Sequence, residues 1–332
     1  MKEESNKELS YLYGFIFFFF AVSLSVIAGF RPLEFFRDTA VYLDIIHSDI
    51  NMWSMEPTVW LINKINTTLG GKDQGFFFIY AILGVSLKAY AIKKISPLPL
   101  LSLYLYVCLY FVLHEMTQIR VGVACGIFLL ALPDLANRNY KGYLLKSVIA
   151  ILFHYSAVIM LVLYCLRADK ISKLLYCALP LLGITISAFP DLVLSFFKLS
   201  IFFLPDFLGS KVGIYLSLIN DEGFNKINIF NFFVLSLMCF YYFVIFNIKK
   251  FSIGVEFLLI KLFGLQLFVY YSLSAVPAFS IRLSEFLGVC LIITLPYLVL
   301  IFKDKLLPTV FFMLWGAGYF FYISIGRLIN LD

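Results

Sequence analysis

Long apolar runs recur along the whole chain and alternate with short polar segments. Each run is close to the ~20 residues that a helix needs to cross a hydrocarbon layer about 30 Å thick. The runs that predict membrane-spanning helices are residues 11–30, 75–92, 97–113, 118–135, 143–166, 174–204, 229–248, 255–275, 286–302 and 306–325. We therefore expect an all-α, polytopic integral membrane protein with about 10 to 11 transmembrane helices. Residues 1–332 are predicted to form a single transmembrane domain.

The clusters of lysine and arginine lie between the apolar runs, and such clusters mark the cytoplasmic side of a membrane protein. With a cytoplasmic N-terminus, the segments on the outer side are 31–74, 114–117, 205–228, 277–285 and the C-terminal tail. Loop 31–74 holds an apolar, helix-length piece from Pro57 to Leu69 that starts with Glu56-Pro57, a favourable helix entry. Loop 205–228 mixes charged and apolar residues in a similar way. We predict outer amphipathic helices in both loops and a lid role for them.

One segment conflicts with this orientation, because 143–166 has basic clusters at both ends but is only long enough for one crossing. Two resolutions remain open. Either the chain makes a re-entrant hairpin at His154, or 174–204 makes two short passes around Pro190-Asp191. Broken helices are tolerated where they face protein or a water-filled cavity, so both alternatives indicate an internal cavity in this region.

Composition narrows the class of protein further. The chain has 62% hydrophobic and 14% charged residues, with a mean hydropathy of +0.95, which is far from a soluble domain. The net charge of +6 is concentrated between the spans and indicates orientation, so no nucleic-acid partner is expected. The six cysteines lack the spacing of a disulfide framework or a zinc site, and nucleotide-binding and metalloprotease motifs are absent from the sequence. We expect neither a metal nor a cofactor.

Arginines and carboxylates are concentrated on the predicted outer side, where few arginines are expected. The polar and charged residues there are Arg31, Arg37, Asp38, Tyr42, Asp44, His47, Glu56, His114, Glu115, Gln118, Arg120, Arg282 and Glu285. Arg120 is the first candidate because it interrupts an apolar region, where an ionised group needs a partner or a ligand. It could form a structural salt bridge with Glu115 or Glu285. Alternatively Arg120, Arg282 and Arg37 could hold a diphosphate without metal, because a guanidinium binds phosphate oxygens in a two-pronged manner.

Three other residues are candidates for proton transfer. His154 interrupts an apolar segment, either as a neutral hydrogen-bonding core residue or as a proton acceptor. Asp38 and Glu56 lie in the outer loop, where a solvated carboxylate is the ordinary interpretation. Both gain interest because Arg37-Asp38, followed by Tyr42, comes soon after the first span.

The order of these short motifs along the chain resembles that of a known protein family. They are Arg37-Asp38 with Tyr42, then Glu56-Pro57, then Gln118 to Ala124, then His154 to Ala157, and late in the chain Arg282 to Phe286. From about residue 11 to residue 302 the sequence resembles the EpsG-like branch of the Wzy polysaccharide polymerases.

The resemblance implies a glycosyltransferase C-like enzyme of the bacterial inner (cytoplasmic) membrane, with its active site facing the periplasm or outer side. Such an enzyme transfers a growing glycan from undecaprenyl diphosphate to the non-reducing end of a lipid-linked repeat unit, which extends O antigen, capsule or a similar glycan. Its implied partners are the lipid-linked donor and acceptor and membrane lipid. The resemblance leaves open whether a chain-length regulator protein binds.

Roles for the candidates follow from this reaction. Arg120 and Arg282 would contact the donor diphosphate, Arg37 either diphosphate, and His154, Glu56 or Asp38 would serve as the base. Glu115 and Gln118 would orient Arg120, and Tyr42 and Glu285 complete the predicted substrate-binding set. Three rival functions are an O-antigen ligase, a flippase or transporter of the lipid-linked unit, and a membrane O-acyltransferase. The ligase would carry a late histidine, the transporter inverted repeats, and neither is found in the sequence.

Overall fold

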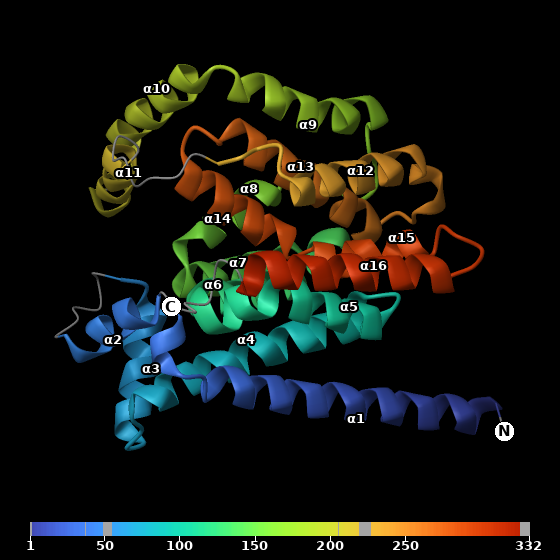
Figure 1. Cartoon of the computed structure of the whole chain (residues 1–332), viewed down its shortest axis with the longest axis horizontal. Helices are drawn as coiled ribbons and strands as arrows, with labels where there is room; N and C mark the ends of the chain where they lie inside the picture. Colours follow the sequence, from blue (N-terminus) through green and yellow to red (C-terminus); the bar gives the residue numbers. More distant parts are fainter. Residues whose placement is uncertain (1, 37, 49–54, 205, 219–226, 326–332) are drawn as a thin grey trace. The chain divides into compact units, whose positions relative to one another are not determined.

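The computed structural model describes the chain except for residues 1, 37, 49–54, 205, 219–226 and 326–332. Every regular element among the described residues is a helix, as Figure 1 shows. The all-α prediction is therefore confirmed for this part of the chain.

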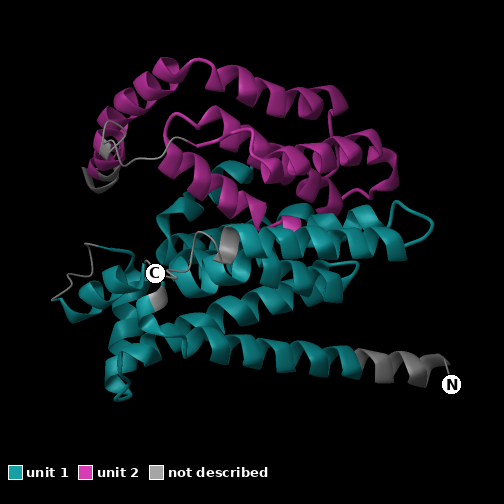
Figure 2. Ribbon diagram, viewed as in Figure 1, with its two compact units in different colours: residues 1–166, 292–332 teal, residues 167–291 magenta. Residues whose placement is uncertain are grey.

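Contacts within the chain divide it into two compact units, coloured separately in Figure 2. Unit 1 comprises residues 1–166 and 292–332, and unit 2 comprises residues 167–291. That the two units act as one transmembrane domain stays a prediction.

Unit 1 is built around α4 (Asp73–Ile95), which packs against α1 (Lys2–Gly29) on one side and α6 (Ile119–Ala136) on another. The approach of α1 to α4 requires a glycine, because a Cβ on Gly29 would lie 2.2 Å from the ring of Phe78. The remaining helices of this unit are α2 (Thr39–His47), α3 (Pro57–Thr68), α5 (Pro99–Tyr106), α7 (Tyr140–Phe153), α8 (Ile159–Leu163), α15 (Leu291–Val299, which begins at the unit boundary) and α16 (Leu306–Tyr319). Between α5 and α6 the chain continues as a π-helix, Val107–Thr117.

Unit 2 is built around α13 (Val255–Ser272), which packs against α9 (Lys173–Ser187) and α14 (Pro277–Gly288). Its other helices are α10 (Pro190–Ser200), α11 (Asp206–Leu218) and α12 (Phe232–Phe246). A small apolar core of Val193, Phe197, Val212 and Val276 joins α10 and α11 to the residue that precedes α14.

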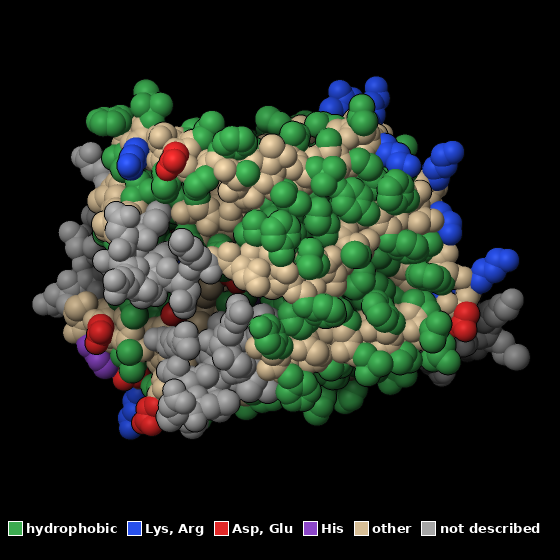
Figure 3. All heavy atoms as spheres, turned by 45° about the horizontal axis from the view of Figure 1, so that its top comes forward, with side chains coloured by type: hydrophobic (Ala, Val, Ile, Leu, Met, Phe, Trp, Pro, Cys, Tyr) green, Lys and Arg blue, Asp and Glu red, His purple; other side chains and the backbone are tan. Residues whose placement is uncertain are grey.

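Five helical segments are long and apolar enough to cross a membrane, and the number rises to seven if each of two bent helix pairs forms one span. The five are Tyr11–Gly29, Asp73–Ile95, Pro99–Thr117, Ile119–Ala136 and Val255–Ser272. Apolar side chains cover much of the face drawn in Figure 3, and Phe15, Phe18 and Phe19 of α1 are mostly exposed. These features indicate a polytopic membrane protein, whereas the predicted 10 to 11 spans are not confirmed, because several predicted runs form shorter or bent helices.

Both break points weighed from the sequence are present in the structure. Helix α7 ends before His154, whose backbone is extended at φ −157° and ψ 130°. Helices α9 and α10 meet at a 90° bend before Pro190. The chain therefore breaks at both places, and the number of crossings in each stays a prediction.

The two loops that the sequence places on the outer side contain helices, as predicted, and their side of the membrane stays a prediction. In loop 31–74, α3 starts at Pro57 as expected, and α2 precedes it. In loop 205–228, α11 accounts for the described part, and residues 219–226 lie outside the described residues. Residues 114–117 were predicted to connect two spans on the outer side, but they form the last turn of the π-helix and are buried. The side of the membrane on which they lie stays a prediction.

Candidate functional site

Glu56 is the centre of a polar cluster in unit 1. It is the residue before α3, with an extended backbone at φ −62° and ψ 130°, and Pro57 then starts the helix with its preset φ. The Glu56 side chain is 2% exposed. Its Oε2 forms a salt bridge with Nη1 of Arg120, and its Oε1 lies 3.0 Å from Nδ1 of His154. One buried carboxylate thus bridges a guanidinium and an imidazole, which we call the Arg120–Glu56–His154 cluster.

Arg120 reaches this cluster because of a change in helix type. The backbone N–H of Gln118 bonds to the carbonyl of Leu113 at 2.7 Å, which closes the π-helix, and α6 begins at the next residue. Arg120 therefore lies in the first turn of α6. Its Nε donates to the hydroxyl of Tyr42 at 3.4 Å, and its guanidinium carbon lies 5.3 Å from the centre of the Tyr42 ring. The arginine is held by a carboxylate and by an aromatic face.

His154 reaches the cluster because α7 ends there. Its backbone N–H still bonds to the carbonyl of Ala150 at 2.9 Å, but the residue itself is extended. Two contacts tie this break to the start of α3: Thr58 Oγ1 donates to the carbonyl of Leu152 at 2.9 Å, and the Tyr155 hydroxyl donates to the carbonyl of Met55 at 3.2 Å. The imidazole and the Glu56 carboxylate are therefore fixed against each other.

The charges of the cluster follow from its contacts. Burial alone would raise the pKa of Glu56, but the hydrogen bond with His154 and the charge of Arg120 outweigh it and lower that pKa to about 2. Glu56 is consequently a carboxylate at neutral pH. Burial raises the pKa of the Tyr42 hydroxyl, so Tyr42 stays a neutral hydrogen-bonding group beside Arg120.

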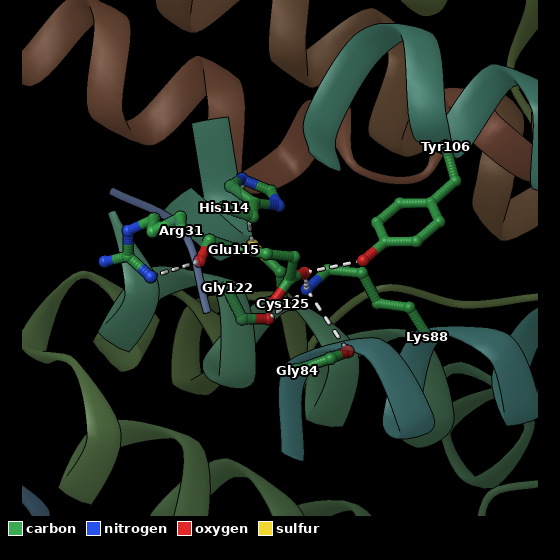
Figure 4. Close-up of polar contacts among 8 residues, drawn as sticks. All are labelled: Arg31, Gly84, Lys88, Tyr106, His114, Glu115, Gly122 and Cys125. Carbon is green, nitrogen blue, oxygen red and sulfur yellow. Dashed lines mark hydrogen bonds and ion pairs between the residues drawn. The ribbon is translucent and has the colours of Figure 1, made fainter. Parts of the chain in front are cut away.

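A second buried ion pair of unit 1 joins Lys88 and Glu115, as Figure 4 shows. Nζ of Lys88 on α4 lies 2.6 Å from Oε1 of Glu115 and donates to the carbonyls of Gly122 at 2.6 Å and Gly84 at 3.5 Å. The Tyr106 hydroxyl donates to the same Glu115 oxygen at 2.8 Å. Lys88 and Glu115 are 0% and 1% exposed. We call these five residues the Lys88–Glu115 cluster; it joins α4, the π-helix and α6.

The sequence-predicted candidates fall into separate places. The structure brings together Glu56, Arg120, His154 and Tyr42. Asp38, half-buried, is the residue before α2, and Gln118, also half-buried, forms the junction that precedes α6. Glu115 bonds to Lys88 and Tyr106 through its carboxylate, while the salt bridge of Arg120 is with Glu56, in place of the Glu115 or Glu285 considered from the sequence.

The other predicted residues are not in this part of the structure. Arg37 lies outside the described residues. Arg282 and Glu285 belong to α14 of unit 2, where Nη1 of Arg282 donates to the Tyr215 hydroxyl of α11 and the guanidinium lies 5.2 Å from the centre of the Tyr215 ring. No group of three or more metal-ligating side chains occurs among the described residues.

The sequence reasoning missed Lys88 and did not single out Arg31. A signal for Lys88 existed, because it is the one charged residue between the start of its apolar run and Lys93, and a buried ammonium needs an acceptor. Arg31 was visible only as one of several outer arginines. Nothing in the local sequence indicates that its side chain is buried.

Comparison with known proteins places the chain in a family. The family model described as EpsG family matches residues 14–329, nearly the whole chain. The chain belongs to the EpsG family. A relative of this EpsG-family chain is the amylovoran biosynthesis protein AmsC of Erwinia amylovora, 24% identical over 185 residues, or 51% of this chain and 49% of AmsC. The chain thus spans about half the length of the curated relative it matches, and no solved structure matches it.

Proposed function

We propose that this EpsG-family protein is a membrane glycosyltransferase that polymerises a polysaccharide. Family membership and the biosynthetic name of the AmsC relative support a role in polysaccharide synthesis. The observation that carries the proposal is the bridging of Arg120 and His154 by the Glu56 carboxylate, because glycosyl transfer from a diphosphate needs a cation and a base close together.

In the proposed reaction the donor is a growing glycan on a lipid diphosphate, undecaprenyl diphosphate in a bacterial inner membrane. The hydroxyl at the non-reducing end of a lipid-linked repeat unit attacks the anomeric carbon of the donor. The bond between that carbon and the diphosphate oxygen breaks, and its electron pair leaves with the diphosphate. Arg120 stabilises the developing negative charge, because its guanidinium lies in a mostly buried site where electrostatic interactions are stronger than in water.

His154 is the base that this geometry favours over Glu56 and Asp38. A carboxylate with a pKa of about 2 is a weak proton acceptor. Glu56 Oε1 instead faces Nδ1 of His154 at 3.0 Å and orients the imidazole, and Nε2 is the atom assigned to take the proton of the acceptor hydroxyl. Asp38 is the remaining competitor, because its charge raises the pKa of Tyr42 and it therefore lies near the cluster.

The remaining assignments are part of the same proposal. Arg282 and Arg37 are further diphosphate ligands, Tyr42, Gln118 and Glu285 belong to the substrate-binding set, and loops 31–74 and 205–228 are lid elements. Glu115 is assigned to holding the start of α6 through Lys88, since Lys88 donates to the Gly122 carbonyl of that helix. The site faces the periplasm or outer side, and a chain-length regulator is a candidate partner.

A surface-glycan gel of cells tests this function. We compare a deletion with His154→Gln and Arg120→Lys at matched membrane abundance, and use His47→Gln as the control because His47 is an exposed histidine of the same outer loop. The proposal expects the glycan ladder to collapse to a single repeat unit in the deletion and both site variants, and to stay complete in His47→Gln. Polymer that persists in the deletion but is not exported or attached would favour a flippase or a ligase instead.

A further inference from the structure

Arg31 is a buried arginine whose backbone and one guanidinium nitrogen are held in place. It follows α1, and its side chain is buried at 3% residue exposure. Nη1 donates to the carbonyl of Ala28 at 2.9 Å and to the carbonyl of Glu115 at 3.3 Å, the second of which is drawn in Figure 4. Nε2 of Gln74 donates to the carbonyls of Gly29 at 2.6 Å and of Arg31 itself at 3.0 Å. The backbone and one guanidinium nitrogen of Arg31 are therefore both held by hydrogen bonds.

The other two nitrogens of the Arg31 guanidinium have no hydrogen-bond acceptor in the described part of the chain. They are Nε and Nη2, and both are shielded from solvent. Their N–H bonds lie on the same edge of the planar guanidinium, the edge that accepts two oxygens of a carboxylate or phosphate side by side. This edge of Arg31 therefore has the geometry to bind two oxygens of an anion.

The electrostatics of Arg31 agree with an unfilled anion site. Leaving charged donors buried without acceptors is unfavourable, so such groups commonly belong to functional sites. Burial lowers the pKa of Arg31 to about 10, and the guanidinium is therefore still charged at neutral pH. The charge of Glu115 attracts Arg31, but no hydrogen bond joins the Glu115 carboxylate to Nε or Nη2: Oε1 is bound by Lys88 and Tyr106, and Oε2 has no hydrogen-bond partner among the described residues.

Arg31 is connected to the proposed catalytic cluster through two aromatic rings. Its guanidinium carbon lies 4.4 Å from the centre of the Phe77 ring, and the Phe77 ring packs edge-on against Tyr42 with centres 6.1 Å apart. The guanidinium of Arg120 is another neighbour of Tyr42, 5.3 Å from the centre of its ring. Arg31 and Arg120 therefore approach the same Phe77 and Tyr42 pair, one from the end of α1 and one from the start of α6.

We propose that Arg31 is a second phosphate-binding residue of the site, which takes two oxygens of a substrate phosphate through Nε–H and Nη2–H while Nη1 keeps its carbonyl contacts. This inference rests on the proposed function. Because Arg31 is buried, a phosphate reaches it only when neighbouring side chains are displaced; the rings of Phe77 and Phe36 lie 4.4 Å and 5.6 Å from the guanidinium carbon. The ligand class is a phosphate or diphosphate ester.

The test measures binding of farnesyl diphosphate to the full-length protein in nanodiscs of phosphatidylcholine, with inorganic pyrophosphate and farnesol as separate probes. Arg31→Lys is the informative variant, because it keeps the charge and can still donate to the carbonyls but loses the paired edge. Arg120→Lys is the positive control, and Lys94→Gln, at an exposed position of α4, is the matched negative control. Thermal unfolding without ligand verifies that every variant is folded.

The inference expects Arg31→Lys to weaken farnesyl diphosphate binding about tenfold or more, with farnesol binding unchanged. Equal weakening of farnesyl diphosphate and farnesol would overturn it, since a merely structural role acts on both. Wild-type affinity in Arg31→Lys together with lost affinity in Arg120→Lys would also overturn it and leave the proposed function standing. Absence of farnesyl diphosphate binding by the wild type would contradict the proposed function and this inference together. Binding of inorganic pyrophosphate with the same dependence on Arg31 would identify the phosphates, rather than the lipid tail, as the recognised group.

Discussion

The two buried ion-pair clusters of unit 1 use similar residues but differ in solvent exposure and in the partners of the cation. In the Lys88–Glu115 cluster the ammonium has three acceptors, and both charged side chains are at most 1% exposed. In the Arg120–Glu56–His154 cluster the arginine is 18% and the histidine 12% exposed, and the carboxylate is shared with a second titratable group. A pair that is sealed from solvent can fix a structure, whereas a pair with residual exposure and a histidine can also bind and react. The difference teaches which charges to assign to structure and which to function.

The Lys88–Glu115 cluster also positions the Arg120–Glu56–His154 cluster. Lys88 donates to the carbonyl of Gly122, and Gly122 lies in the same first turn of α6 as Arg120. Glu115, at the end of the π-helix, is the salt-bridge partner of Lys88. The Lys88–Glu115 cluster therefore holds the junction between the π-helix and α6, from which Arg120 reaches Glu56.

Removing one partner of the Lys88–Glu115 ion pair is expected to have the largest effect on stability. Lys88→Met leaves the Glu115 carboxylate buried without its counter-ion, which destabilises by about 3–5 kcal/mol. We expect a strong loss of folded protein, measured by thermal unfolding in detergent. The double variant Lys88→Met with Glu115→Met removes both charges and should recover much of that loss. An unchanged unfolding temperature in Lys88→Met alone would show that the pair does not stabilise the fold.

Substitutions in the Arg120–Glu56–His154 cluster should reduce activity more than stability. His154→Gln keeps a hydrogen-bonding side chain but removes the proton acceptor, so we expect the polymerisation rate per folded molecule to fall roughly 10²–10⁴-fold. The unfolding temperature should change far less than in Lys88→Met. A full rate in His154→Gln would transfer the role of base to Asp38.

A substitution at Gly84 provides a milder test of the Lys88–Glu115 cluster. A Cβ at Gly84 would lie 2.1 Å from Oε2 of Glu115, so Gly84→Ala forces the carboxylate to shift and should cost roughly 1–3 kcal/mol. Gly318→Ala is the control, because nothing lies within 4 Å of its added Cβ. Equal unfolding temperatures of the two variants would contradict the tight packing of Glu115 against α4.

Glu56 should contribute a pH dependence of stability that is confined to acidic pH. Its pKa is lowered from 4.5 to about 2 in the folded protein, so its stabilising contribution is fully present above about pH 4.5 and is lost as the pH falls toward 2. We expect the difference in unfolding temperature between wild type and Glu56→Gln to shrink over this window. A difference that stays constant between pH 4.5 and 2 would contradict the ionised state assigned to Glu56.

Much of the fold could be predicted from the sequence because apolar length and proline act locally. Residues 75–92 and 118–135 were predicted as helices and correspond to α4 and α6, and Pro57 correctly predicted the start of α3. The π-helix was not predicted, because its wider pitch changes hydrogen bonding without changing the apolar pattern. For this reason residues 114–117 were mistaken for a loop.

The candidate site could be predicted only as a set of residues. Glu56, Arg120 and His154 were each singled out because a charged or titratable group in or beside an apolar run needs an explanation. Their pairing was not predictable, since it depends on where α7 ends and how α3 packs on it. The partner of Glu115 was missed because Lys88 lies on another helix, far away in the sequence.

The central claim is that the Arg120–Glu56–His154 cluster performs glycosyl transfer. The most direct test reconstitutes the purified protein in vesicles with an undecaprenyl-diphosphate-linked repeat unit and measures polymer formation per folded molecule. We compare His154→Gln with His47→Gln, a variant at an exposed histidine outside the cluster. The account predicts that His154→Gln is folded but forms polymer roughly 10²–10⁴-fold more slowly, whereas His47→Gln forms polymer at the wild-type rate. Full polymer formation by His154→Gln and Arg120→Lys would contradict the account.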